Sequence, residues 1–155
     1  RDAGAPEGLA GLWAQVRSQM RGEKDERLKR WMAAVYMGEL IGFKAYRAPS
    51  EGLPAVAATL HDQYIEKGKM PTRALDRLVY RALALWLHAV GFEGDVREIA
   101  GALQLREAEA VIYLKYLGCK YKRVAANGEK RVVASLPIPL TFPPIARARG
   151  PRRTT

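Results

Sequence analysis

The sequence has one cysteine, Cys119, among its 155 residues. A single cysteine excludes an intrachain disulfide and a cysteine-based zinc site, and it is typical of a protein from a reducing compartment. No apolar run reaches the roughly 20 residues that a membrane-spanning helix needs. The start, Arg1 to Gly8, lacks the apolar centre of a signal peptide. We therefore expect no membrane partner, and the abrupt start indicates a fragment of a longer protein.

The sequence also has few residues arranged for catalysis. Its two histidines, His61 and His88, fall in separate predicted helices, and neither has a second histidine or a carboxylate at metal-ligand spacing. We find no glycine loop of the kind that holds phosphates, no nucleophile elbow and no paired carboxylates. The sequence therefore predicts no enzyme, no catalytic residue, no metal and no cofactor.

Acidic residues are scarce in the last quarter of the chain, where basic residues are plentiful. The net charge is +10, from 26 Lys and Arg against 16 Asp and Glu. Residues 120–155 hold nine of the basic residues and a single acid, Glu129, whereas residues 1–119 are nearly balanced. A charge of this sign and placement favours a polyanion such as DNA or RNA as the partner of the C-terminal part.

Apolar residues recur at helical spacing over most of the chain. The pattern predicts helices over residues 9–20, 24–47, 53–65, 71–90, 95–105 and 106–117. In the second helix we expect one apolar stripe facing the core, made of Leu28, Trp31, Met32, Val35, Tyr36, Leu40 and Phe43. We also expect Trp13, Trp31 and Trp86 to pack in the core. Tyr113, Tyr116 and Tyr121 are expected in the core as well, and the alternative for these three is stacking on the bases of melted DNA.

The order of parts from residue 95 onward is that of a winged helix. Asp95 is expected to cap a short helix, with Glu98 three residues later as in a capping box. A turn at Gln104 and Leu105 leads into the next helix, and two basic strands over 120–126 and 129–136 then flank Asn127-Gly128, a pair typical of a tight hairpin turn. The prolines after residue 136 exclude further central strands. The segment with Leu136, Ile138, Leu140 and Phe142 is expected to pack, extended, on the surface of the domain.

The basic residues of the hairpin and the tail are the candidate nucleic-acid-binding residues. Lys120 and Lys122 alternate and share a face, and Lys130 and Arg131 lie across the turn, so we expect a positive ribbon that follows a phosphate backbone. The alternative is a solvated edge hairpin protected by its charges. With the preceding helix, the complete set is Arg106, Lys115, Lys120, Lys122, Arg123, Lys130, Arg131, Arg147, Arg149, Arg152 and Arg153.

The helix over 106–117 takes the place of the recognition helix in a helix-turn-helix module. Glu107 and Glu109 on this helix repel phosphate, while Arg106 and Lys115 attract it. Contact with the DNA backbone, independent of sequence, therefore fits this helix better than base reading.

Residues 25–153 resemble a known family. Four segments carry the resemblance: RLVYRALALWLHAVGF (77–92), DVREIAGALQL (95–105), YLKYLGCK (113–120) and ASLPIPLTFPP (134–144) followed by arginines. RLKRWMAAVYMGELIGF (27–43) agrees more weakly. Together they resemble the C-terminal tandem winged-helix domain of the forty-nine-kilodalton subunit of RNA polymerase I. Two departures are the acidic REAEA (106–110) and the short segment 66–70, which leaves little room for a wing in the first half.

The resemblance implies a mostly α, tandem winged-helix (helix-turn-helix) fold with a small β hairpin. It divides the chain into a first, reduced winged helix over 9–70, a second winged helix over 71–146 and a basic tail over 147–155. It implies duplex DNA and the core subunits of RNA polymerase I as partners, and a location in the nucleus and nucleolus. A smaller dimerisation partner would bind through an N-terminal module that this chain lacks.

The expected function is therefore DNA binding, largely independent of sequence, that supports initiation and elongation of ribosomal RNA synthesis. The alternative is a docking scaffold within a transcription complex that makes no DNA contact. A basic RNA-binding domain is a third possibility, but the aromatic sheet and glycine-loop motifs of common RNA-binding modules are missing.

Overall fold

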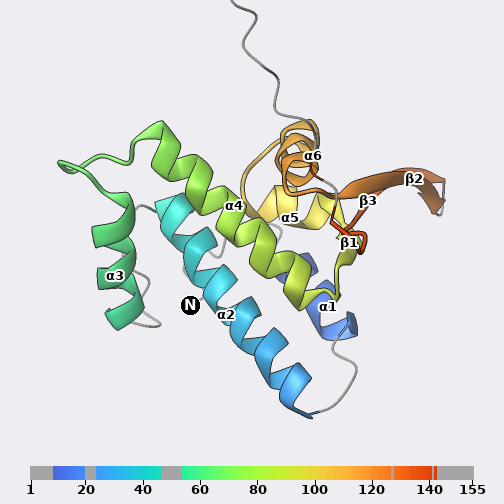
Figure 1. Cartoon of the computed structure of the whole chain (residues 1–155), viewed down its shortest axis with the longest axis horizontal. Helices are drawn as coiled ribbons and strands as arrows, with labels where there is room; N and C mark the ends of the chain where they lie inside the picture. The colour runs from blue at the N-terminus through green and yellow to red at the C-terminus, as the bar shows by residue number, and fades with distance from the viewer. Residues whose placement is uncertain (1–8, 20–23, 47–53, 127, 141, 143–155) are drawn as a thin grey trace, which may run out of the picture.

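The computed structural model describes residues 9–19, 24–46, 54–126, 128–140 and 142. It is mostly helical with a small antiparallel sheet, as expected from the sequence (Figure 1). The elements are α1 (Leu9–Gln19), α2 (Lys24–Tyr46), α3 (Pro54–Tyr64), α4 (Thr72–Ala89), β1 (Glu93–Asp95), α5 (Val96–Ala102), α6 (Glu107–Tyr116), β2 (Lys120–Ala126) and β3 (Glu129–Ser135). Each predicted helix is confirmed to within a few residues of its ends.

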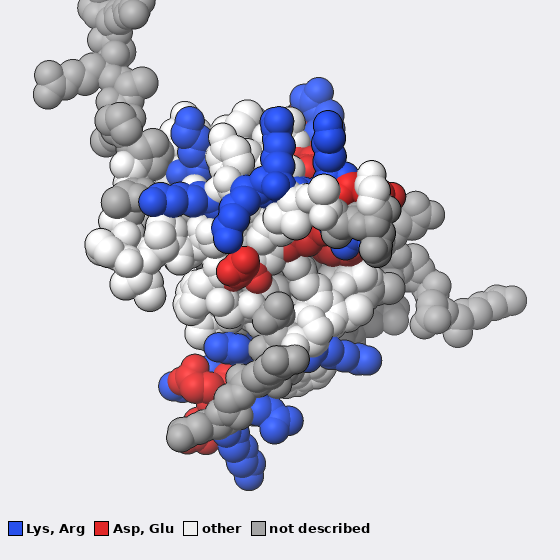
Figure 2. Space-filling model, turned by 90° about the vertical axis from the view of Figure 1, so that its right-hand side faces the viewer, with Lys and Arg blue, Asp and Glu red and all other residues white. Residues whose placement is uncertain are grey.

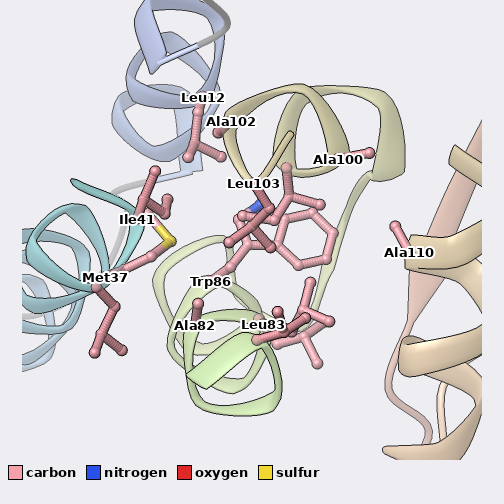
Figure 3. Close-up of a cluster of buried hydrophobic side chains, with 14 of the residues drawn as sticks. Leu12, Met37, Ile41, Ala82, Leu83, Trp86, Ala100, Ala102, Leu103 and Ala110 are labelled. Carbon is pink, nitrogen blue, oxygen red and sulfur yellow. The ribbon is translucent and has the colours of Figure 1, made fainter. Parts of the chain in front are cut away.

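Helix α4 is the centre of the core. It lies beside α2 along most of its length (Figure 1). Trp86 of α4 is fully buried, and its ring lies next to Leu103, which follows α5 (Figure 3). Its indole Nε1 donates a hydrogen bond to Gln15 Oε1 at 3.3 Å, so that α1 is tied to α4 across the core. Burying a side chain of this size contributes several kcal/mol, about 3–5 by the cost of truncating it.

The core runs without a break from the first half of the chain into the second. Leu12 and Val16 of α1 are fully buried in the same cluster as Ile99 and Leu103, and α1 packs on α5. Lys44 of α2 donates a hydrogen bond to the Leu103 carbonyl at 2.5 Å, at the C-terminal end of α5 where a cation is favoured. The division at residue 70 stays a prediction, and the core is shared across it.

The first half of α2 differs from the sequence prediction. Leu28, Trp31 and Met32 are 56%, 43% and 63% exposed, so the expected burial of this part of the stripe is wrong. Leu40 and Phe43, at the end of the predicted stripe, are buried as expected. The other buried positions of α2 lie on the neighbouring face: Ala33, Ala34, Met37 and Ile41. The two alanines let α2 and α4 approach closely, which the larger side chains on the other face would not allow.

The sheet has a third strand that the sequence analysis did not predict. Its order is β1-β3-β2. The ladder joining β2 and β3 runs from Lys120↔Ser135 to Ala126↔Glu129, which confirms the hairpin and its two-residue loop. Asn127 itself lies outside the described residues, and Gly128 has the positive φ of 78° that such a turn needs. Three residues of β1 complete the sheet on the other side of β3.

The segment after β3 packs less than expected. Leu136 packs on the core, and its backbone N–H donates to the Phe92 carbonyl at 2.9 Å. Ile138, Leu140 and Phe142 are 93%, 51% and 65% exposed, so the prediction of surface packing is wrong for these three. Prolines at 137 and 139 cannot donate backbone hydrogen bonds, which prevents the segment from joining the sheet. Within the described helices, none has the length and apolar character required to cross a membrane.

Candidate nucleic-acid interface

The five basic residues of the hairpin are divided between its two faces. Because neighbouring residues of a strand point to opposite sides, the ladder register places Lys120, Lys122 and Arg131 on one face and Arg123 and Lys130 on the other. All five are exposed. The expectation of one continuous ribbon is therefore wrong, because Lys130 and Arg131 are adjacent in the strand and point apart.

The face with Arg123 and Lys130 is the one that meets α6. Near the base of the hairpin this face carries Tyr121 and the buried Ala134. These two side chains surround a small apolar space together with Val96, Val111, Leu114 and Cys119. Arg123 and Lys130 lie further along the same face, beyond the core. They therefore project into the angle between the hairpin and α6.

The opposite face of the hairpin mixes its cations with acids. Arg131 lies 3.7 Å from a carboxylate oxygen of Asp95 and 4.0 Å from Glu129, and Arg97 of α5 lies 2.8 Å from Glu129. The hydrogen bond and charge of Glu129 raise the pKa of Arg97 above its usual value. Glu129 and Asp95 therefore neutralise part of the charge on this face, while Lys120 and Lys122 stay solvated.

Arg106, at the start of α6, is also paired. Its guanidinium donates to Glu109 Oε1 at 2.6 Å, and its backbone N–H donates to Glu109 Oε2 at 3.1 Å. The Arg106 guanidinium lowers the pKa of the Glu109 carboxyl below its usual range. The two charges largely cancel, so Arg106 offers less to a phosphate than its position suggested.

Lys115 is exposed, and it lies one helical turn after Val111. Because Val111 faces the hairpin, residues four positions apart place Lys115 on the same side of α6. Lys115, Arg123 and Lys130 thus border one surface. Figure 2 shows basic side chains gathered over the upper part of the face that the hairpin presents, with acidic side chains directly below them.

Two of the three tyrosines expected in the core are exposed. Tyr116 is 60% and Tyr121 51% exposed, so that prediction is wrong for both. Tyr113 is half-buried and packs edge-on against Tyr80, with 5.0 Å between the ring centroids. Its hydroxyl donates to Asp76 Oδ1 at 2.6 Å. That hydrogen bond and the negative charge of Asp76 raise the pKa of Tyr113 to about 12.

The remaining predicted site residues, Arg147, Arg149, Arg152 and Arg153, lie outside the described residues. Sequence reasoning missed the acids that pair with Arg131 and Arg97. Asp95 was recognised only as a helix cap, and nothing in the local pattern indicates that β1 places it beside β3. Over the part of the chain that the structure describes, no three His, Cys, Asp or Glu side chains come together as metal ligands do.

Two comparisons with known proteins bear on the family of the chain. The sequence model of one family, described as A49-like RNA polymerase I associated factor, matches residues 11–143, which is most of the chain. No curated protein matches the sequence.

Proposed function

Since the chain belongs to the family of A49-like RNA polymerase I associated factors, we propose that it is the DNA-binding tandem winged-helix part of such a factor. It supports initiation and elongation of ribosomal RNA synthesis in the nucleus and nucleolus. Its partners are duplex DNA and the core subunits of RNA polymerase I. A smaller dimerisation subunit binds through a module outside this chain.

One observation supports the DNA-binding part of the proposal above all. Three unpaired cations, Lys115, Arg123 and Lys130, border the angle between α6 and the hairpin, and none of them makes an ion pair with a described residue. In a winged helix, this angle is where the second helix of the helix-turn-helix and the wing meet nucleic acid. With Arg106 neutralised by Glu109 and few polar side chains to read bases, contact is largely with phosphates.

The two faces of the hairpin allow a matched test. Arg123→Ala with Lys130→Ala removes two cations from the α6 side, and Lys120→Ala with Lys122→Ala removes two from the other side. We expect the first pair to weaken duplex binding equally for all sequences. The plot of log affinity against log salt should become shallower by roughly 0.9 for each phosphate that the variant no longer neutralises.

The second pair serves as the control, because it removes equal charge from the same hairpin. We expect it to change affinity and salt slope less than the first pair, as measured by fluorescence anisotropy. If the wild-type chain binds duplex DNA and both pairs leave affinity and slope unchanged, the assignment of the hairpin is wrong. Competition between duplex DNA, single-stranded DNA and RNA then identifies the preferred polyanion.

A docking role without DNA contact is the second candidate. The exposed apolar residues Leu28, Trp31 and Met32 on α2 favour it, as does the acidic start of α6 with Glu107 and Glu109. Contiguous exposed apolar side chains are typical of protein contact surfaces. This candidate predicts no measurable DNA affinity for the chain at physiological salt, together with co-purification with polymerase subunits that Met32→Glu abolishes.

A further inference from the structure

A second basic surface lies at the other end of α4 from the hairpin. It consists of Lys67, Lys69, Arg73, Arg77 and Arg81, all of which are exposed. Lys67 and Lys69 belong to the loop between α3 and α4, which protrudes on the left of Figure 1, while the hairpin of β2 and β3 projects on the right. The arginines lie on α4. The sequence analysis assigned no role to any of these residues.

The loop holds its lysines on a tight, hydrogen-bonded turn. Glu66 and Lys69 pair through both backbone hydrogen bonds, 2.8 Å and 3.0 Å long. The two residues between them have positive φ angles, 51° for Lys67 and 74° for Gly68. Two successive positive φ angles make the tight turn that suits a β-hairpin. The segment thus forms a tight turn closed by one isolated β-bridge, with Lys67 at its tip.

The arginines of α4 form a stripe beside this turn. Residues 73, 77 and 81 are spaced four apart and therefore lie on one side of the helix. Arg77 donates to the Gln63 carbonyl at 2.9 Å, and Arg81 donates to the Tyr64 hydroxyl at 2.8 Å. Both guanidinium groups lie over the Tyr64 ring, 5.4 Å and 5.6 Å from its centroid. These contacts hold the Arg77 and Arg81 side chains in place without pairing either charge with an acid.

Acids do not cancel this charge. Lys67, Lys69 and Arg73 make no ion pair with any residue that the structure describes. Asp76, the nearest acid along α4, accepts its hydrogen bond from Tyr113 on the α6 side. Asp76 keeps its negative charge, so with Asp62 and Glu66 three carboxylates neighbour the five cations in the sequence, and none of the three makes an ion pair with them. The surface therefore keeps a net positive charge.

We propose that Lys67, Lys69 and Arg73, backed by the arginine stripe, form a second contact surface for the phosphate backbone of duplex DNA. This proposal rests on the proposed function. Helix α4 has 18 residues, which gives a length of about 27 Å. A duplex rises about 3.4 Å per base pair, so the length of α4 corresponds to roughly eight base pairs. A single chain holds DNA at two places, and the reduced first half takes part in binding.

The test uses the full chain and a labelled duplex of about 30 base pairs, which is roughly 100 Å long and several times the length of α4. The variant is Lys67→Ala, Lys69→Ala and Arg73→Ala, which leaves the residues around Tyr64 intact. The charge-matched control is Lys24→Ala, Arg27→Ala and Lys29→Ala at the exposed N-terminal end of α2. Circular dichroism shows whether each variant is folded.

We expect the Lys67, Lys69 and Arg73 variant to bind about tenfold more weakly near 0.1 M salt, with a salt slope shallower by roughly 2 to 3. The control should change affinity only slightly. If the wild-type chain binds and this variant matches the control in affinity and slope, the second surface is refuted while the proposed function stands. If the wild-type chain does not bind duplex DNA, the proposed function fails as well.

Discussion

Gly94 occupies a position where a side chain does not fit. It is buried in β1, and a Cβ there would lie 2.6 Å from Trp86 Cζ2 and 3.1 Å from Val90 Cγ2. We expect Gly94→Ala to lower the free energy of unfolding by about 1–3 kcal/mol, because the core must shift to admit the methyl group. Urea denaturation followed by circular dichroism measures the change.

Gly101→Ala is the matched control for this substitution. Gly101 lies in α5, and a Cβ there would meet nothing within 4 Å. Alanine at an open helical position stabilises by about 0.5–1 kcal/mol. Equal loss of stability in both variants would contradict the packing described around Trp86.

Tyr113 should make stability depend on pH at the alkaline end. Its pKa in the folded chain is raised to about 12 by its hydrogen bond to Asp76, whereas an unfolded tyrosine ionises near pH 10. Between these values the folded state holds a proton that the unfolded state has released, so stability falls as pH rises. The contribution is complete below about pH 10 and is lost by about pH 12.

Urea denaturation of the wild type and of Tyr113→Phe from pH 8 to pH 12 tests this expectation. The phenylalanine variant should be less stable by about 1–3 kcal/mol at pH 8, because Asp76 loses its hydrogen-bond donor. The difference should shrink toward pH 12. A difference that stays constant across this range would show that the hydroxyl does not carry the effect.

Among the elements, α5 depends on its cap. Asp95 Oδ1 accepts a hydrogen bond from the Arg97 backbone N–H at 2.9 Å, and the other carboxylate oxygen lies 3.7 Å from Arg131. Asp95→Ala should destabilise the chain by about 0.5–2 kcal/mol through loss of the cap. Asp95→Asn keeps a capping oxygen and removes the ion pair, so we expect a loss below about 1 kcal/mol.

Thermal or urea unfolding of both Asp95 variants separates the two contributions. A loss for the asparagine variant as large as that for alanine would mean that the ion pair with Arg131, and not the cap, stabilises this corner.

Periodicity and turn chemistry identified the helices and the hairpin because these are local signals. Trp86, Leu83 and Leu78 recur at helical spacing, and Asn127-Gly128 marks the turn whatever surrounds it. Strand β1 has no such signal. Glu93-Gly94-Asp95 has no apolar alternation, and it becomes a strand only because β3, forty residues later, pairs with it. The exposed half of α2 was mispredicted because periodicity identifies an apolar stripe but not which neighbouring face the partner helix covers.

The same limit applies to the candidate site. The excess positive charge of the hairpin is evident from the composition. The two-residue loop sets the register of the two strands, and the register determines which side chains lie on each face of the hairpin. The pairing of Arg106 with Glu109 is local, three residues apart, but only the separate effects of these charges on phosphate were expected from the sequence. The pairing of Arg131 with Asp95 joins residues brought together only by the sheet, and no sequence pattern reveals it.

For the whole molecule, the shared core predicts a single unfolding transition. Leu12 of α1 is fully buried, and α1 packs on α5, so Leu12→Ala should lower the stability of both halves together by about 2–5 kcal/mol. Leu28→Ala, at a 56% exposed position, should change it by less than about 0.5 kcal/mol. Tryptophan fluorescence and far-ultraviolet circular dichroism should give coincident urea curves.

Two separated transitions, of which Leu12→Ala moved only one, would instead support independent halves with a boundary near residue 70.

The exposed residues Leu28, Trp31 and Met32 have a consequence for how this chain behaves in solution. At 0.1 M salt the net charge of +10 keeps copies of the chain apart, since the repulsion acts over about 10 Å. At 1 M salt the range of this repulsion shrinks to about 3 Å, so the exposed apolar residues of neighbouring copies can come into contact. Added salt should thus weaken the proposed binding to DNA while it promotes self-association of the chain.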